Sequence, residues 1–199
     1  MSDRKLPTPS SDTEVNRFLE QVASLPVSPG PRGRLIFALD ATASRQPTWD
    51  QACQLQNEMF QETARLGGLT VQLAWYRGFK EFQTSSWVSD PRELTRIMEP
   101  VHCVGGMTQI GRVLHHAVDE TRRHRINALV LVGDCMEENP DTLQALAGEL
   151  GLLGVPVFVF HEGGEPRAAA TFRQIARLSR GAYCAFDAGS ARQLRELLS

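Results

Sequence analysis

A carboxylate and two hydroxyl side chains follow an apolar run at alternate positions in the first quarter of the chain. The run, residues 34–39 with the sequence RLIFAL, is long enough for one buried β-strand, and Asp40, Thr42 and Ser44 come after it. Carboxylate and hydroxyl oxygens are the ligands that hard divalent cations prefer. This stretch therefore predicts a set of oxygen ligands at the end of a strand.

Two later segments could bring more ligands to the same place. Residues 128–133 form a second apolar run, which also ends on a carboxylate, and the loop at 105–108 (GGMT) leads into a predicted helix. In open α/β sheets, ligands bind beyond the carboxyl ends of the strands, where the strand order reverses. If the two apolar strands are neighbours, five residues converge on one site that suits Mg²⁺: Asp40, Thr42, Ser44, Thr108 and Asp134.

The elements that must position these residues alternate between strands and helices. Strands are predicted at 34–39, 69–76, 79–83, 128–133, 155–160 and 181–186. Helices are predicted at 47–66, 90–98, 109–124, 139–152, 171–179 and 190–198. The turn at Arg77 and Gly78 makes one strand pair antiparallel. The pattern thus predicts an α/β fold with a doubly wound, Rossmann-like open sheet, mostly parallel with one antiparallel edge strand, and helices on both faces.

The start of the chain differs in composition from the rest. Residues 1–10 are polar, residues 11–22 have the apolar spacing of a short amphipathic helix, and residues 26–31 (PVSPGP) form a stiff linker. A chain of 199 residues has room for one domain of ordinary size. We therefore predict an N-terminal arm at 1–31 and one domain at 32–199. The amphipathic helix either packs on that domain or docks to a partner.

Composition argues against several classes of function. The 21 basic and 23 acidic residues are spread along the chain, so no basic field is available to attract nucleic acid. The first residues lack the apolar core of a signal peptide, and no apolar run approaches the roughly 20 residues that span a bilayer. The four cysteines are too widely spaced to indicate a disulfide framework or a zinc cluster. We expect a cytoplasmic protein with reduced thiols and no membrane partner.

Three spaced elements resemble a known metal site. The D-x-T-x-S motif from Asp40 to Ser44, the loop at 105–108, and Gly133 with Asp134 look like the metal-ion-dependent adhesion site of von Willebrand factor type A (VWA) domains, in the same order. Residues 154–160 and 172–176 are similar to a late strand and helix of that family, so the resemblance covers residue 32 onwards. It is suggestive of a bacterial-type, intracellular, single-domain member.

This resemblance implies a non-enzymatic, metal-dependent protein interaction module. In the family the hydroxyls bind the cation directly, the carboxylates act partly through water, and an aspartate or glutamate of a partner completes the coordination. The expected cofactor is Mg²⁺, with Mn²⁺ or Ca²⁺ as alternatives, and the unidentified protein partner could belong to an ATPase-containing assembly. Thr42 departs from the usual serine; it keeps the hydroxyl, but its methyl group could crowd an incoming ligand.

Two other interpretations compete with this one. A Mg²⁺-dependent phosphohydrolase could use Asp40 as its nucleophile, but such enzymes commonly need a second carboxylate two residues later, where this chain has Thr42. Alternatively, the site is vestigial in a scaffold protein, and the five residues act only as helix caps and turn formers. In that case the N-terminal helix would dock to the partner.

Residues beside the predicted ligands have simpler expected roles. Glu137 and Glu138 are expected to be solvated loop charges. Trp49 is either an exposed anchor for a partner or part of the core. Cys135 has no defined base or oxyanion element nearby, so we expect a buried thiol rather than a nucleophile.

Overall fold

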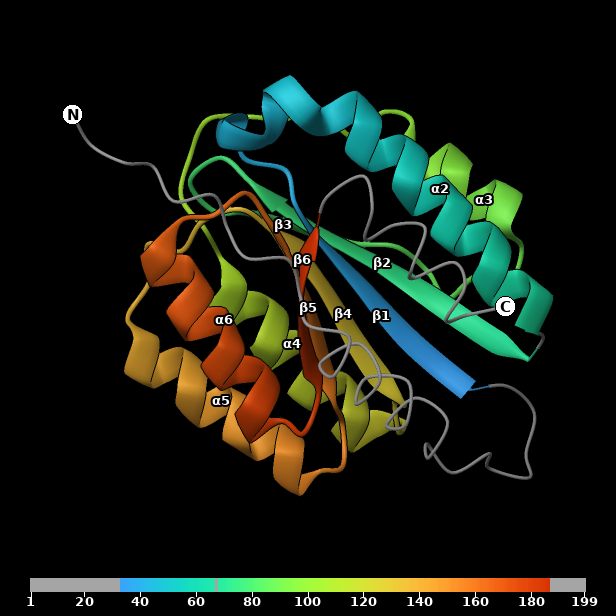
Figure 1. Cartoon of the computed structure of the whole chain (residues 1–199). Helices are drawn as coiled ribbons and strands as arrows, with labels where there is room; N and C mark the ends of the chain where they lie inside the picture. Colours follow the sequence, from blue (N-terminus) through green and yellow to red (C-terminus); the bar gives the residue numbers. More distant parts are fainter. Residues whose placement is uncertain (1–32, 67, 187–199) are drawn as a thin grey trace.

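The computed structural model describes residues 33–66 and 68–186, in which a six-stranded sheet lies between two layers of helices (Figure 1). The strands are β1 (Gly33–Asp40), β2 (Leu69–Arg77), β3 (Glu81–Thr84), β4 (Ala128–Gly133), β5 (Val157–Glu162) and β6 (Ala182–Phe186). Their order in the sheet is β3-β2-β1-β4-β5-β6, and only the β2–β3 pairing is antiparallel. The predicted α/β class and the single antiparallel edge strand are confirmed.

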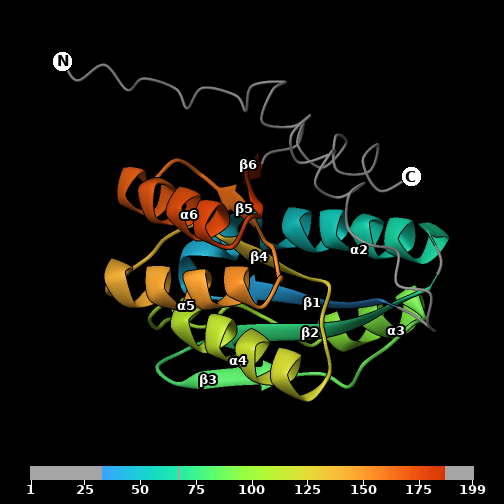
Figure 2. The ribbon, with the colours of Figure 1, turned by 90° about the horizontal axis from the view of Figure 1, so that it is seen from below.

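The helices cover both faces of the sheet, as Figure 2 shows. A short 3-10 helix, η1 (Ala43–Thr48), leads into α2 (Trp49–Leu66), which packs with α3 (Pro91–Met98) on one face. The other face is covered by α4 (Ile110–Arg123), α5 (Pro140–Leu152) and α6 (Pro166–Leu178). No helix in the described part of the chain is long and apolar enough to cross a membrane.

The two faces of β1 explain why its sequence is apolar without interruption. Ile36 and Ala38 belong to the core beneath α4, α5 and α6, whereas Phe37 and Leu39 belong to the core beneath α2 and α3. Successive side chains of a strand point to opposite faces, so a strand that is covered on both sides needs apolar residues at every position. The same requirement accounts for the continuous run in β4, which is buried throughout.

Helix starts follow one local rule, which also corrects a predicted boundary. Asn139 caps α5 by accepting the N–H of Asp141 at 2.9 Å, and Pro140 occupies the first turn. Glu165 caps α6 in the same way, with a proline after it, so α6 begins at Pro166 and not at residue 171. The expected helix from residue 47 instead splits into η1 and α2. The whole predicted N-terminal arm at 1–31, with its helix at 11–22, and the helix predicted at 190–198 lie outside the described residues.

The order of the strands sets the position of any ligand site. β1 lies between β2 and β4, and all three strands are parallel. The chain leaves β1 toward α2 on one face and leaves β4 toward α5 on the opposite face. The two connections therefore separate at the carboxyl edge of the sheet, and the crevice between them is the place where ligands bind in such folds.

Candidate metal centre

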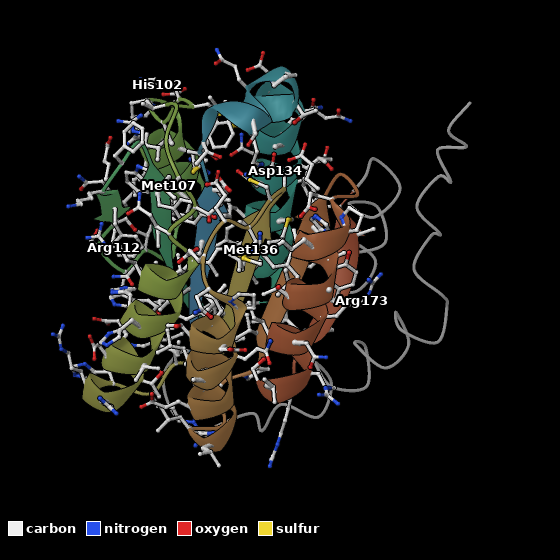
Figure 3. All side chains as sticks on the ribbon, turned by 90° about the vertical axis from the view of Figure 1, so that its left-hand side faces the viewer. His102, Met107, Arg112, Asp134, Met136 and Arg173 are labelled. Atoms are coloured by element: carbon white, nitrogen blue, oxygen red, sulfur yellow. The ribbon has the colours of Figure 1, made fainter. Side chains whose placement is uncertain are left out.

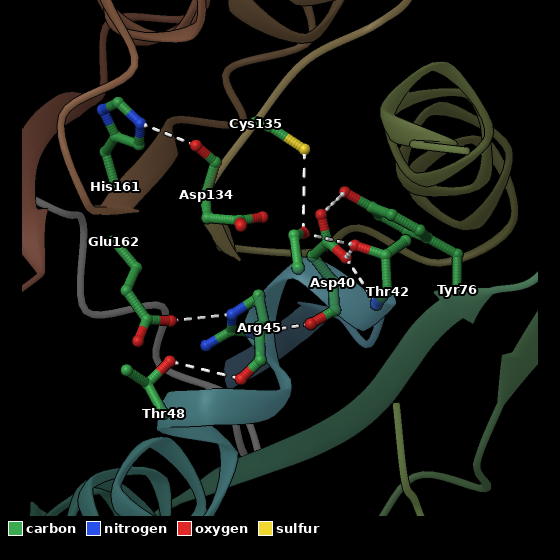
Figure 4. Close-up of polar contacts among 10 residues, drawn as sticks. Asp40, Thr42, Arg45, Thr48, Tyr76, Asp134, Cys135, His161 and Glu162 are labelled. Carbon is green, nitrogen blue, oxygen red and sulfur yellow. Dashed lines mark hydrogen bonds and ion pairs between the residues drawn. The ribbon is translucent and has the colours of Figure 1, made fainter. Parts of the chain in front are cut away.

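Two carboxylates and one thiol meet in that crevice (Figure 4). Asp40 ends β1 and is fully buried, and Asp134 follows the last residue of β4. Potential ligand atoms of Asp40, Asp134 and Cys135 all lie within 4.8 Å of one another. The convergence of Asp40 and Asp134, which the sequence predicts if their strands are neighbours, is present in the structure.

A chain of hydrogen bonds orders the hydroxyl groups around Asp40. The backbone N–H and the hydroxyl of Thr42 both donate to Oδ1 of Asp40, at 2.8 and 2.6 Å. The Thr42 hydroxyl also lies 3.1 Å from the hydroxyl of Ser44, so Ser44 donates to Thr42 in this arrangement. Tyr76 donates its hydroxyl to Oδ2 of Asp40 at 3.0 Å. The D-x-T-x-S motif is thus a preformed cluster of oxygen atoms.

Asp134 contrasts with Asp40 because one of its oxygens has no partner. Oδ1 of Asp134 is inaccessible to solvent and makes no hydrogen bond. The backbone carbonyl of Asp134 lies 3.1 Å from Nε2 of His161. Because a carbonyl can only accept, Nε2 carries the proton of the neutral imidazole, and Nδ1 accepts from the Tyr183 hydroxyl at 2.8 Å. A buried carboxylate oxygen without a partner is unfavourable, and a bound cation would satisfy it.

Arg45 holds the loop that follows β1 in place through buried contacts. Its side chain is only 1% exposed, its Nη1 donates to the backbone carbonyl of Asp40, and its Nε donates to Glu162 at the end of β5, at 2.8 Å. The guanidinium also lies over the ring of Trp49, 5.3 Å from its centre. Trp49 is itself buried and donates Nε1–H to the carbonyl of Val101, so it belongs to the core and is not an exposed anchor.

Thr108 is bonded to the loop that follows Asp134. The Thr108 hydroxyl accepts the N–H of Glu137 at 3.0 Å, and the Glu137 carboxylate accepts the N–H of Thr108 at 2.9 Å. Glu138 accepts the N–H groups of Ile110 and Gly111 at 2.7 and 2.8 Å. Glu137 is exposed in the loop, as expected, and Glu138 is partly exposed, but both carboxylates also bind backbone N–H groups. Glu138 satisfies two free N–H groups in the first turn of α4, where negative charge is favoured, and Glu137 binds the N–H of Thr108 just before that helix.

A close contact between two backbones holds the loop that carries Thr108. Met107 donates its N–H to the carbonyl of Gly78 at 3.1 Å, and Val104 donates to the carbonyl of Ala41 at 3.0 Å. A Cβ atom on Gly106 would lie 1.9 Å from that same Gly78 oxygen. Glycine is therefore required at position 106, and the contact places this loop beside the loop that follows β1.

Cys135 lies beside the predicted ligands, although the sequence did not predict it as part of the centre. It was expected to be buried, but its thiol is half-buried and lies 4.0 Å from the hydroxyl of Ser44. Burial, together with the charges of Asp134 and Asp40, raises the pKa of the Cys135 thiol to about 12. The thiol is neutral near pH 7, so the charged groups in the centre are carboxylates.

Comparisons with known proteins support the fold class. The chain matches no family model and no curated protein, but its fold is similar to that of solved VWA domains. A von Willebrand factor type A structure from Catenulispora acidiphila is 16% identical, with a TM-score of 0.66 over 85% of this chain and 42% of the other. The SpRpn10 VWA domain is 13% identical, with a TM-score of 0.66 over 84% of this chain and 94% of the other.

A third structure extends the comparison to another kind of protein. It is an aerotolerance-related membrane protein from Bacteroides fragilis NCTC 9343, solved with multiple mutations to serines. It is 16% identical, with a TM-score of 0.64 over 83% of this chain and 98% of the other. The TM-scores of these structures establish a shared VWA-type fold, and identities of 13–16% establish the fold alone.

The stability of the metal-free protein is expected to decrease as the pH rises from about 4 to about 6. Burial raises the pKa of Asp40 from 3.8 to about 6, so the folded state holds this proton more tightly than the unfolded state. Ionisation of Asp40 should therefore cost the folded state about 3 kcal/mol across this interval. Urea unfolding in EDTA at several pH values measures the effect.

Asp40→Asn is the matched variant for this prediction. Its amide keeps an acceptor for Thr42, and the Tyr76 hydroxyl can turn to accept from the amide nitrogen. The variant should lack the decrease between pH 4 and 6. If the free energies of unfolding of the two proteins change with pH in parallel, the pKa of Asp40 is not raised and the prediction is wrong.

Proposed function

We propose that the protein is a metal-dependent protein interaction module whose centre holds Mg²⁺, with Mn²⁺ or Ca²⁺ as alternative cations. The observation that carries the proposal is the buried, unpaired Oδ1 of Asp134 close to the carboxylate of Asp40. Carboxylates and hydroxyls are hard oxygen ligands, which Mg²⁺ prefers. The residues that would hold the cation are Asp40, Thr42, Ser44, Thr108 and Asp134.

The outer side of the centre suits a partner. Ser44 and Met107 are exposed, whereas Asp40, Thr42 and Thr108 are buried. A divalent cation held by these buried residues would keep a coordination position open to solvent, where it would attract an acidic side chain of another protein. The partner would supply an aspartate or glutamate. We also propose that this partner belongs to an ATPase-containing assembly. A cytoplasmic location is also part of the proposal, and the four free thiols are compatible with it.

The hydrogen bonds of Asp40 argue against phosphohydrolase activity. Hydrogen bonds from Thr42 to Oδ1 and from Tyr76 to Oδ2 make the Asp40 carboxylate a weaker nucleophile, while Oδ2 keeps a lone pair for a cation or its water. The position two residues after Asp40, where a second carboxylate would act as acid and base, carries a threonine. We therefore assign no catalytic residue and propose a protein without enzymatic activity.

Calorimetry with a matched pair of variants tests the proposal. Thr42→Val removes the hydroxyl but keeps the shape of the side chain, and Thr42→Ser keeps the hydroxyl. Titration of MgCl₂ into the EDTA-treated and dialysed proteins should give binding heats for wild type and Thr42→Ser and none for Thr42→Val. A pull-down with Mg²⁺ or EDTA should then show partners that depend on both the cation and the hydroxyl. Equal heats from all three proteins would refute the metal centre.

A further inference from the structure

Exposed apolar side chains are few in the described part of the chain, and two of them lie beside the candidate metal centre. Phe79 is 75% exposed and Met107 is 50% exposed. They belong to two loops in direct contact, because Met107 donates its N–H to Gly78, the residue before Phe79. Leu152 and Leu178, the other large exposed apolar residues, end α5 and α6 at the opposite edge of the sheet.

Met107 connects this apolar surface to the centre. It precedes Thr108, whose hydroxyl is bonded to the loop that follows Asp134. Figure 3 shows Met107 and Asp134 at the same end of the molecule. A ligand that reaches the cation with one side chain can therefore cover Met107 with a neighbouring one.

Basic groups flank the apolar surface on the side away from Asp134. Lys80 and Arg112 are exposed, and Nη1 of Arg112 donates to the backbone carbonyl of Lys80 at 2.8 Å, which joins the β2–β3 turn to α4. Glu81, the nearby acid, is paired with Arg77 at 2.8 Å. Among the described residues, Lys80 and Arg112 have no acidic partner, although Arg112 also donates to Oε1 of Gln109 at 2.8 Å and lies over the ring of Phe82. Glu137 accepts the N–H of Thr108, next to Met107, and Glu138 accepts the N–H groups of Ile110 and Gly111, next to Arg112. Both acidic groups therefore lie close to this surface, with their carboxylates bound to backbone N–H groups.

We infer that the surface formed by Phe79, Lys80, Met107 and Arg112 recognises an acidic and apolar segment of a protein partner. The inference rests on the proposed function, in which one acidic side chain of the partner completes the coordination of the cation. An apolar side chain next to that acid would cover Phe79 and Met107, and further carboxylates would pair with Lys80 and Arg112. A basic segment would be repelled by these two groups even if it carried the same central acid.

Fluorescence anisotropy with labelled synthetic peptides tests the inference on the full chain in MgCl₂ and in EDTA. The first peptide has one aspartate in a glycine–serine background, and the second adds a leucine beside the aspartate. The third adds two glutamates to the second, and the fourth adds two lysines instead. The third peptide should bind about tenfold more tightly than the first or the fourth. Phe79→Ser should remove the gain from leucine, and Lys80→Glu should abolish the preference for glutamate over lysine, because Arg112 then faces a carboxylate. Leu152→Ser, an equally exposed change at the other edge, should alter neither.

The outcomes separate this inference from the proposed function. If EDTA abolishes all binding but Phe79→Ser and Lys80→Glu leave the ranking unchanged, the inference is wrong and the metal-dependent module stands. If the ranking depends on Phe79 and Lys80 but persists in EDTA, the recognition surface stands and the role of the cation is wrong. Failure of every peptide to bind contradicts the inference, and MgCl₂ calorimetry then decides the proposed function independently.

Discussion

Replacement of Asp134 by asparagine is expected to abolish Mg²⁺ binding and, at the same time, to stabilise the metal-free protein. The Asp134 carboxylate lies close to that of Asp40, and its Oδ1 has no hydrogen-bond partner. The amide removes one of two neighbouring like charges, and Arg45 and the hydrogen bonds from Thr42 only partly offset the charge of Asp40 in the metal-free state. Wild type should gain about 2.7 kcal/mol at a Mg²⁺ concentration one hundred times its Kd, whereas the variant should gain none. Thermal unfolding across a MgCl₂ series would show the two stabilities crossing.

The control for this experiment is Asp141→Asn, which makes the same change in charge. Asp141 is exposed in the first turn of α5 and does not belong to the cluster of ligand atoms. This variant should keep the Mg²⁺-dependent gain of wild type. An unchanged Mg²⁺ affinity in Asp134→Asn would exclude Asp134 from the centre.

Replacement of Arg45 by methionine is expected to cause the largest loss of stability. Arg45 is 1% exposed, and its partner Glu162 has a side chain that is only 15% exposed. Removal of one member of a buried ion pair leaves the other charge without compensation, which typically costs about 3–5 kcal/mol. The change also removes the donor to the Asp40 carbonyl and the contact with Trp49. The free energy of unfolding in urea measures the loss.

Arg122→Met offers a matched comparison at an exposed ion pair. Arg122 and Glu149 have side chains that are 60% and 38% exposed, and exposed pairs contribute about 0–1 kcal/mol. The double variant Arg45→Met with Glu162→Leu should recover part of the loss, because no buried charge is then left alone. Equal losses at positions 45 and 122 would show that the buried pair has no special role.

The sequence predicted the meeting of Asp40 and Asp134 because one physical rule connects the pattern to the geometry. Two apolar runs that each end on a carboxylate become parallel neighbours, and the carboxyl ends of parallel strands share one edge of the sheet. The hydroxyls of Thr42 and Ser44 follow from the same local spacing. The start of α6 was equally accessible, since Glu165 and Pro166 repeat the cap-and-proline pattern that identified α5 at Asn139.

Other features of the centre depend on contacts between residues far apart in the chain. Glu137 and Glu138 look like loop charges in the sequence, and their bonds to Thr108 and to the start of α4 span 27 to 29 residues. The ion pair of Arg45 joins residues 117 positions apart. Spacing rules apply within one helix or strand, so they could not anticipate either arrangement.

The hydrogen bonds among Asp40, Thr42 and Ser44 have a consequence for the kinetics of cation exchange. Because these groups already restrain one another in the metal-free protein, an arriving ion has little loop structure to reorganise. Mg²⁺ releases its hydration water reluctantly and keeps several molecules of it when bound. Loss of water from the ion, and not motion of the protein, should therefore limit the rate of association, so that Ca²⁺ would enter the centre faster than Mg²⁺.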